Sequence, residues 1–243
     1  MIFSYKNLMN KKFSIIIPIY NEEESIFLLL EEIIKTFSNN KPEIIIVNDG
    51  SDDQFLEKFN SKFLSLNNLI LKNHAVNIGK SMAMLTGIKS AQNNIIAVID
   101  GDGQNPPKEI KKLISTWNNQ KNKKYLIVCG NRIKRQDTFL KKMSSLIANK
   151  VRKKLLNDEC NDTACALKVF DKKDYITLPY FRNMHRFLPA LFKMKGGKII
   201  NIDVEDRKRL KGVSKFNFNN RFWIGIIDLL KVWLLIKKER RKS

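Results

Sequence analysis

The 243-residue sequence predicts an α/β fold with a mostly parallel sheet, helices on both faces of that sheet and a C-terminal amphipathic helix. Two observations support this prediction. Runs of Ile and Val alternate along the chain with segments whose apolar residues recur every three or four positions. The Ile and Val runs are continuous, which is typical of strands buried on both faces of a parallel sheet between layers of helices.

The N-terminal half alternates between these two kinds of segment. Strands are expected at residues 13–19, 43–47, 68–72, 95–99 and 125–129. Helices are expected between them, at residues 22–37, 53–66, 80–91 and 107–117. In the first of these helices an apolar face can cover the sheet, and it consists of Ile26, Leu29, Leu30, Ile33 and Phe37.

The C-terminal half is less regular. We expect a basic amphipathic helix at residues 141–156, a strand at 164–170, a helix at 184–194, a strand at 199–204 and a last helix at 222–236. The chain shows no repeat or linker. We therefore expect one domain over residues 1–218, followed by an interfacial helix and a basic tail over residues 219–243.

Composition limits the partners of the chain. The net charge of +21 implies an anionic partner, which could be nucleic acid, an anionic membrane or a phosphorylated substrate. Hydrophobic residues make up 43% of the chain, which excludes a disordered protein. The three cysteines form no Cys-x-x-Cys pair, which argues against a disulfide framework or a structural zinc site. Residues 1–12 have no signal-peptide core, and no apolar run reaches the roughly 18 residues of a membrane span.

The most informative segment is residues 100–107, Asp-Gly-Asp-Gly-Gln-Asn-Pro-Pro, which follows the fourth apolar run. Residues two apart in an extended chain point the same way, so Asp100 and Asp102 can face one ligand, with Gln104 as a further oxygen donor. Oxygen ligands of this kind suit Mg²⁺ or Mn²⁺, completed by substrate phosphates. The alternative is a polar turn that the two prolines close.

Other polar residues are expected at the same edge of the sheet. Glu22 could reach a base or sugar, and Asp49 could accept hydrogen bonds from a nucleobase or ribose. Lys80, at the start of a helix, could meet phosphate. The alternatives are an ordinary turn for Asp49 and an ordinary helix start for Lys80.

Together these segments resemble the family 2 glycosyltransferases, which have the GT-A fold, a Rossmann-like fold of nucleotide-diphospho-sugar transferases. Residues 13–22 are similar to the opening strand of that family, and residues 47–51 to its nucleotide-binding turn. Residues 100–107 resemble the metal motif of the branch that includes dolichyl-phosphate mannose synthase and bacterial polyprenyl-phosphate sugar transferases. Further similar segments are residues 130–132, 162–166, 184–187 and 207–216.

The resemblance implies roles for particular residues. For nucleotide binding it implies Pro18, Tyr20, Glu22, Asp49, Lys80 and Asp100. For Mg²⁺ or Mn²⁺ it implies Asp100, Asp102 and Gln104. For catalysis it implies Asp102, Arg132 and Arg207. For the acceptor phosphate it implies Arg132, Lys141, Ser145, His185, Arg186, Arg207 and Lys215.

The implied activity is the transfer of a sugar, with inversion, from a GDP- or UDP-linked donor to a polyprenyl phosphate such as undecaprenyl or dolichyl phosphate. A divalent metal would neutralise the leaving diphosphate. The acceptor phosphate has a second pKa of about 6, so it is largely a dianion at neutral pH and needs no strong general base. Cationic side chains that position two phosphates are sufficient. The candidates for this role are Arg132, His185, Arg186, Arg207, Arg209 and Lys215.

The last helix points independently to a lipid acceptor. Residues 222–236 span about four turns, too short to cross a bilayer. Trp223, Trp233 and the basic tail fit a helix lying in the membrane interface. We therefore expect a peripheral protein on the cytoplasmic face of a membrane. A homo-oligomer or a membrane-protein partner is compatible with this expectation. The alternative is a helix packed on the domain's own core.

Two other functions stay open. A family 2 transferase can also act on a sugar hydroxyl of a glycan or glycolipid, which usually needs a general base. The segment at residues 100–107 and the absence of a base motif argue against it. A basic nucleic-acid-binding protein is favoured only by the net charge, and the sequence carries no DNA- or RNA-binding signature, so we expect no nucleic-acid partner.

Overall fold

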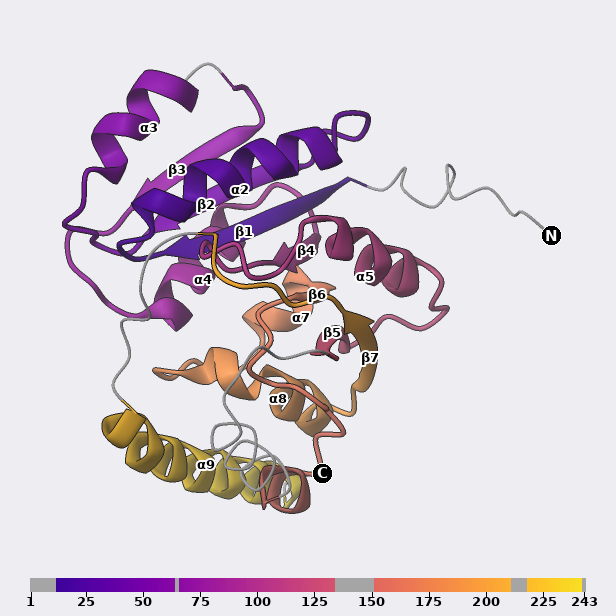
Figure 1. Ribbon diagram of the computed structural model, residues 1–243. Coiled ribbons are helices and arrows are strands. Elements are labelled where there is room, and N and C mark those ends of the chain that lie inside the picture. Colours follow the sequence, from indigo (N-terminus) through magenta and orange to yellow (C-terminus); the bar gives the residue numbers. More distant parts are fainter. Residues whose placement is uncertain (1–11, 64–65, 134–150, 211–217, 242–243) are drawn as a thin grey trace.

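The computed structural model describes residues 12–63, 66–133, 151–210 and 218–241, without the side chains of residues 61–62 and 218–224. At its centre lies a seven-stranded sheet with the order β3-β2-β1-β4-β6-β5-β7 (Figure 1). Its strands are β1 Phe13–Ile19, β2 Glu43–Asn48, β3 Leu69–Asn73, β4 Ile95–Val98, β5 Leu126–Arg132, β6 Lys168–Asp171 and β7 Lys198–Val204.

Most neighbouring strands in the sheet are parallel. β3, β2, β1 and β4 run in one direction, with Ile15 paired to Ile44 and to Ala97 on its two sides. β6 lies antiparallel between β4 and β5, and β5 is again parallel to β7. The predicted α/β class with a mostly parallel sheet is therefore confirmed. The antiparallel direction of β6 was not predicted from the sequence.

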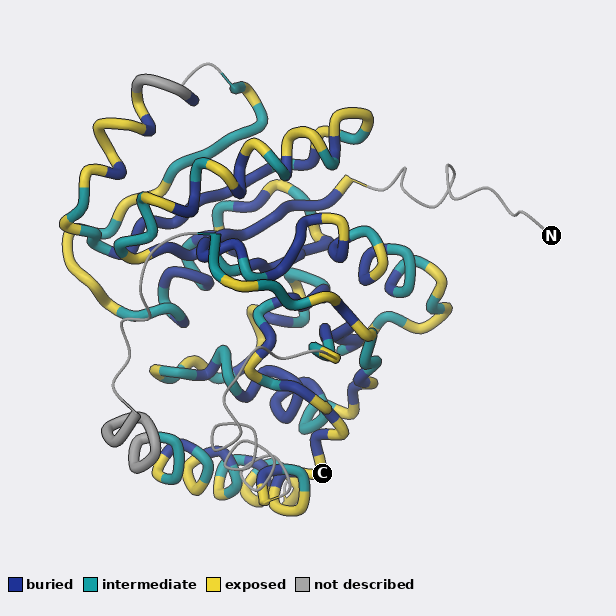
Figure 2. Tube along the Cα trace, in the orientation of Figure 1, coloured by how far each residue is buried: buried dark blue, intermediate teal, exposed yellow. Residues whose placement is uncertain are grey.

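Helices cover both faces of the sheet, as predicted. One buried cluster joins Ile15 and Ile17 of β1 to the helices α2 Glu23–Thr36, α3 Phe55–Phe63 and α5 Lys108–Asn118. The other joins Ile16 of β1 to a second set of helical elements, which are α4 Lys80–Ser90, α7 Lys172–Ile176, η1 Met184–Phe187, α8 Leu188–Met194 and α9 Phe218–Arg240. Successive side chains of a strand point to opposite faces, so the continuous Ile run fills both clusters, and Figure 2 shows the central strands as buried.

Several predicted elements differ from the structure. The predicted strand 164–170 begins only at Lys168, because the backbone N–H of Cys165 bonds back to the carbonyl of Asp162 in a turn. The predicted helix 184–194 divides into η1 and α8, with Pro189 in the first turn of α8. The five-residue helix α7 was not predicted. Most of the predicted helix 141–156 lies outside the described residues, and residues 151–156 are helical.

The last helix packs on the domain along one face. Val232 and Ile236 are buried in the second cluster, and α8 lies between α9 and the strands β5 and β7. Trp233 packs against this cluster and is partly exposed, so its predicted contact with a membrane interface stays a prediction. The side chain of Trp223 lies outside the described residues. Among the described residues, no helix is both long and apolar enough to cross a membrane.

Candidate active site

The carboxyl ends of β1, β2 and β4 meet at one edge of the sheet and bring three polar turns together. Gly50, in the turn after β2, has φ +70°, and a Cβ there would lie 2.4 Å from the carbonyl carbon of Val76. Glycine is therefore required where this turn passes under the loop that leads to α4. The turn after β1 is fixed to it, because the Asn21 backbone N–H donates to the Ser51 hydroxyl at 2.8 Å.

Two aspartates follow β4 as the sequence predicted. Asp102 is buried, whereas Asp100 is partly exposed. Burial, followed by the negative charge of Asp100, raises the pKa of Asp102 to about 6, although the N–H of Gln104 and the charge of Arg209 act in the opposite direction. Glu22 adds a third negative charge that acts on Asp102. A buried carboxylate among like charges is typical of a site that binds a cation.

Two cations face these carboxylates. Lys80, at the start of α4, forms an ion pair with Asp100. The guanidinium of Arg209 contacts two of the carboxylates. Its Nη1 lies 3.3 Å from Oε1 of Glu22, and its Nη2 lies 3.2 Å from Oδ2 of Asp102. The predicted nucleotide and metal residues Glu22, Lys80, Asp100 and Asp102 are thus brought together in one charged cluster.

The segment of residues 205–210, here called the strap, lies on the turn of residues 102–104. The backbone N–H of Arg207 donates to the carbonyl of Gln104 at 2.9 Å, and that of Leu210 to the carbonyl of Asp102 at 3.3 Å. Gly103 has φ +71°, and a Cβ there would lie 2.4 Å from Cδ1 of Leu210. The strap therefore touches the backbone of the candidate metal turn, which only a glycine at position 103 permits.

Arg207 holds this turn from the side. Its Nε donates to the carbonyl of Gly103 at 2.6 Å, and its Nη2 lies 2.5 Å from Oε2 of Glu32 on α2. A second contact joins Nη1 to Oε1 of Glu32 at 3.3 Å, so the pair is bidentate. Arg207 thus binds the candidate metal turn in this structure, and its guanidinium is engaged by protein groups.

Asp49 is almost completely buried and binds the protein itself. Its carboxylate accepts hydrogen bonds from the backbone N–H groups of Ile78 at 3.1 Å and Gly79 at 2.8 Å. His74 Nδ1 lies 2.7 Å from Oδ1 of Asp49, and His74 Nε2 lies 2.9 Å from the hydroxyl of Thr86. These contacts fix the loop that places Lys80 beside Asp100.

The remaining predicted nucleotide residues lie at the same edge. Tyr20 is 40% exposed directly after β1, and Pro18 pairs with Val47 within the sheet. The side chain of Tyr20 is therefore open to a ligand, whereas Pro18 can offer only its carbonyl and ring edge.

The described residues predicted to bind the acceptor phosphate each interact with other groups of the protein. Arg132, at the end of β5, forms a bidentate pair with Asp162, with Nε to Oδ2 at 2.6 Å and Nη2 to Oδ1 at 3.1 Å. His185, in η1, contacts the start of α4, where its Nδ1 is 2.8 Å from the hydroxyl of Ser81.

Arg186 points toward α9. Burial lowers the pKa of Arg186, and the charge of Asp228 partly offsets this effect. Asp228 is itself buried and accepts a hydrogen bond from Nδ2 of Asn183 at 3.0 Å. Lys141, Ser145 and Lys215 lie outside the described residues.

The donor set fits a divalent metal that substrate oxygens complete. Among the described residues, no three His, Cys, Asp or Glu side chains converge as a closed protein cage would require. Mg²⁺ is usually held by one or two carboxylates with waters and phosphate oxygens, and Asp100 and Asp102 match that pattern. Burial and the nearby charge of Asp100 both raise the pKa of Asp102, and a divalent ion at this position would offset both effects.

The sequence prediction missed three residues of this site, namely Glu32, His74 and Ser81. Arg209, in the segment 207–216 that carried the resemblance, was expected as a cation that positions phosphate, and the structure places it beside Glu22 and Asp102. His74 directly follows β3, the third parallel strand, which ends at the same edge. Glu32 and Ser81 contact the site from the faces of α2 and α4, and no local pattern distinguishes them from surface residues.

Comparison with known proteins gives the family. The family model described as Glycosyl transferase family 2 matches residues 14–178, which contain β1, β4 and both aspartates. The chain belongs to glycosyl transferase family 2. The protein is therefore a glycosyltransferase, and the family predicted from the motifs is confirmed.

Two relatives of this glycosyltransferase are named as polyprenyl-phosphate enzymes. It is 30% identical over 234 residues to dodecaprenyl-phosphate galacturonate synthase of Rhizobium johnstonii, covering 94% of this chain and 68% of the relative. It is 33% identical over 213 residues to undecaprenyl-phosphate 4-deoxy-4-formamido-L-arabinose transferase of Photorhabdus laumondii, covering 86% of this chain and 64% of the relative. The chain thus spans about two thirds of the length of these relatives.

A solved structure supports the predicted GT-A fold. Glucosyl-3-phosphoglycerate synthase from Mycobacterium tuberculosis, in complex with Mn²⁺, uridine diphosphate and phosphoglyceric acid, has a TM-score of 0.73 to this glycosyltransferase. The similarity covers 96% of this chain and 82% of that one, at 13% sequence identity. At this identity the likeness establishes the fold, and the GT-A prediction is confirmed.

Proposed function

We propose that this glycosyltransferase moves a sugar, with inversion, from a GDP- or UDP-linked donor to a polyprenyl phosphate. The observation that carries the proposal is the similarity over nearly the whole chain to transferases named for polyprenyl phosphates. The charged cluster of Asp100, Asp102, Lys80 and Arg209 supports it, because a diphosphate leaving group needs cations and a metal at one place.

On the donor side, Asp100 and Asp102 would hold Mg²⁺ or Mn²⁺, with the side chain of Gln104 as a further oxygen donor. The metal would supply neutralisation of the negative charge that grows on the leaving diphosphate. Lys80 adds a cation at the start of α4, where the helix dipole also favours an anion. Tyr20, Glu22 and the edge at Pro18 would bind the nucleoside, while Asp49 would shape the loop below it.

On the acceptor side, the chain has to position a phosphate dianion rather than activate a hydroxyl. We propose His185 with Lys141, Ser145 and Lys215 as its ligands. Arg132 and Arg207 would first have to exchange their present carboxylate partners for the phosphate, and Arg186 is directed toward α9 near the charge of Asp228. We therefore propose that, in the state described, these three arginines hold the segments around the acceptor site in place.

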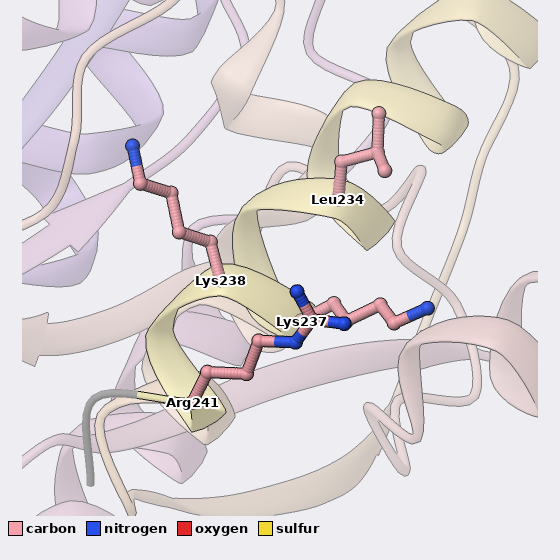
Figure 3. A pocket seen from close by; sticks show the side chains of 4 residues that line it. All are labelled: Leu234, Lys237, Lys238 and Arg241. Atoms are coloured by element: carbon pink, nitrogen blue, oxygen red, sulfur yellow. The ribbon is translucent and has the colours of Figure 1, made fainter.

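We propose that the protein acts as a peripheral protein on the cytoplasmic face of a membrane, and that α9 contacts the lipid. Three apolar side chains on its outer face are half exposed, namely Ile227 at 52%, Leu230 at 50% and Leu234 at 58%. Beyond Leu234 the same end of the helix carries Lys237, Lys238 and Arg241 around a shallow pocket (Figure 3). Apolar residues followed by cations fit an interface with anionic lipids.

One incubation tests the proposed reaction. The protein is mixed with Mg²⁺, undecaprenyl phosphate in detergent and each member of a panel of radiolabelled GDP- and UDP-sugars. We expect label in the lipid extract for at least one donor, and none with Asp102→Asn. Labelling of an added glycan or glycolipid in place of the lipid phosphate would contradict the proposal and favour transfer to a sugar hydroxyl.

A further inference from the structure

The charged cluster at the carboxyl end of β4 contains three carboxylates and two cations. Glu22, Asp100 and Asp102 are the carboxylates, and Lys80 and Arg209 the cations that pair with them. In the part of the chain that the structure describes, Lys80 pairs with Asp100, whereas Arg209 bridges Glu22 and Asp102. Arg209 is therefore the cation that joins the strand ends of β1 and β4.

The contact between Arg209 and Asp102 uses a particular oxygen atom. Oδ1 of Asp102 already accepts the backbone N–H of Gln104 at 3.0 Å. Oδ2 is the atom 3.2 Å from Nη2 of Arg209. A divalent ion that binds Asp102 through Oδ2 would meet the guanidinium there, and the positive charges would repel each other.

The strap holds Arg209 in this position through its neighbours. Arg207 and Leu210, on either side, are both bonded through their backbone N–H groups to the turn of residues 102–104. The side chain of Arg209 is only 21% exposed, unlike that of the adjacent Lys208, which is exposed and for which the described contacts include no ion pair. Arg209 is thus built into the site, in contrast to an ordinary surface charge.

We propose that Arg209 is the resident cation of the metal site in the free protein, and that it makes binding of the divalent ion depend on the nucleotide. This inference rests on the proposed function. In the free protein the ion has to displace Arg209 from Asp102, which leaves the guanidinium facing a positive ion. When a nucleoside diphosphate arrives with the metal, its phosphates supply new negative charge, so the displacement no longer leaves an excess of positive charge.

This arrangement has a thermodynamic consequence that can be measured. The nucleotide should strengthen metal binding, and by reciprocity the metal should strengthen nucleotide binding by the same factor, commonly about 5- to 150-fold for coupled sites. Removal of Arg209 should raise the metal affinity of the free protein. In the variant that lacks Arg209, the increase in metal affinity caused by the nucleotide should be smaller than in the wild type.

The test measures Mn²⁺ binding directly, through the electron paramagnetic resonance signal of free Mn²⁺. The wild type, Arg209→Met, Arg209→Lys and the control Lys208→Met are titrated alone and with saturating UDP or GDP. Without nucleotide we expect Arg209→Met to bind Mn²⁺ about tenfold more tightly than the wild type, since a coupling of this size is typical. Arg209→Lys should lie between them because an ammonium cannot bridge both carboxylates, and Lys208→Met should match the wild type.

Three outcomes would overturn the inference. Unchanged Mn²⁺ affinity in both Arg209 variants, with circular dichroism like that of the wild type, would show that Arg209 does not compete with the metal. An equal gain in Lys208→Met would assign the effect to general electrostatics. If no protein binds Mn²⁺ even with UDP or GDP, the proposed metal site itself fails, a result distinct from the first two.

Discussion

The donor side and the acceptor side of this glycosyltransferase site treat charge in opposite ways. On the donor side, Asp102 is buried near Asp100 and Glu22, and this environment raises its pKa to about 6. On the acceptor side, Arg132 faces the carboxylate of Asp162 in a bidentate pair. Uncompensated charge indicates where a ligand is required, whereas a paired arginine can stabilise the fold without any ligand.

The largest expected effect concerns the donor side. Asp102→Asn should lower the transfer rate at least a thousandfold, about 4 kcal/mol of transition-state stabilisation, because the metal loses a charged ligand. The measurement is the rate of lipid labelling, with Asp52→Asn, an exposed carboxylate in the turn after β2, as the matched control. Full activity of Asp102→Asn, or of the wild type in EDTA, would contradict the proposed metal site on the donor side, and with it the difference drawn between the donor and acceptor sides.

The next effect concerns Arg132 and its pair with Asp162. Asp162→Ala should lower the free energy of unfolding by about 3 kcal/mol, because it leaves Arg132 buried without its partner. Equilibrium unfolding in urea measures this change in the free energy of unfolding. Asp203→Ala serves as the control, since Asp203 is exposed and bonded only to Nδ2 of Asn131 at 2.6 Å among its described contacts. A loss no larger than that of the control would mean that Arg132 is not held as a structural pair.

A third prediction uses pH to separate stability from function. The raised pKa of Asp102 means that its ionised form destabilises the folded protein near pH 7, so Asp102→Asn should raise the free energy of unfolding there by about 2 kcal/mol in EDTA. As the pH falls through about 6 toward 4, the wild-type carboxyl takes up its proton in the folded state and the difference should vanish. Unfolding curves at pH 7, 6 and 4 test this. A difference that grows at low pH would contradict it.

The fourth prediction decides to which side Arg207 belongs. Because Arg207 braces the carbonyl of Gly103 and pairs with Glu32, Arg207→Ala should weaken binding of the metal–nucleotide complex and lower transfer together, each about tenfold. Calorimetry with UDP or GDP and a lipid-labelling assay measure the two, with Lys208→Ala as control. Transfer that falls while nucleotide affinity stays unchanged would return Arg207 to the acceptor side, as the sequence suggested.

The smallest expected effects lie on α9. Lys237→Gln and Lys238→Gln should each weaken binding to anionic vesicles by about 1 kcal/mol, or roughly fivefold. Sedimentation with phosphatidylglycerol vesicles measures this, and Lys121→Gln, at an exposed lysine in the loop between α5 and β5, is the control. Equal losses in all three variants would mean that the whole basic surface, rather than α9, binds the lipid.

Local patterns predicted the donor side well. The continuous apolar run of residues 13–19 became β1 with the same bounds, and Asp100 and Asp102 emerge after β4 as expected. These features depend on neighbours in the chain, and alternation or continuity of apolar residues reports them directly.

Non-local pairing could not be predicted. The direction of β6 depends on β4 and β5, and the partner of Arg207 is 175 residues away in sequence. Whether a motif arginine is available to a ligand depends on that partner. The motif therefore identified Arg132 and Arg207 as notable residues but did not reveal that carboxylates already engage them.

The attachment of α9 also sets a distance. Asp228 ties the helix to Asn183, two residues before His185, and Lys195 pairs with Glu239 near its other end at 2.6 Å. A helix fixed at two points cannot tilt or slide independently of the domain. The position of His185 relative to the outer face of α9 is therefore set by the fold. Under the proposed membrane contact of α9, this fixed separation would set how far a lipid phosphate has to rise from the membrane to reach His185.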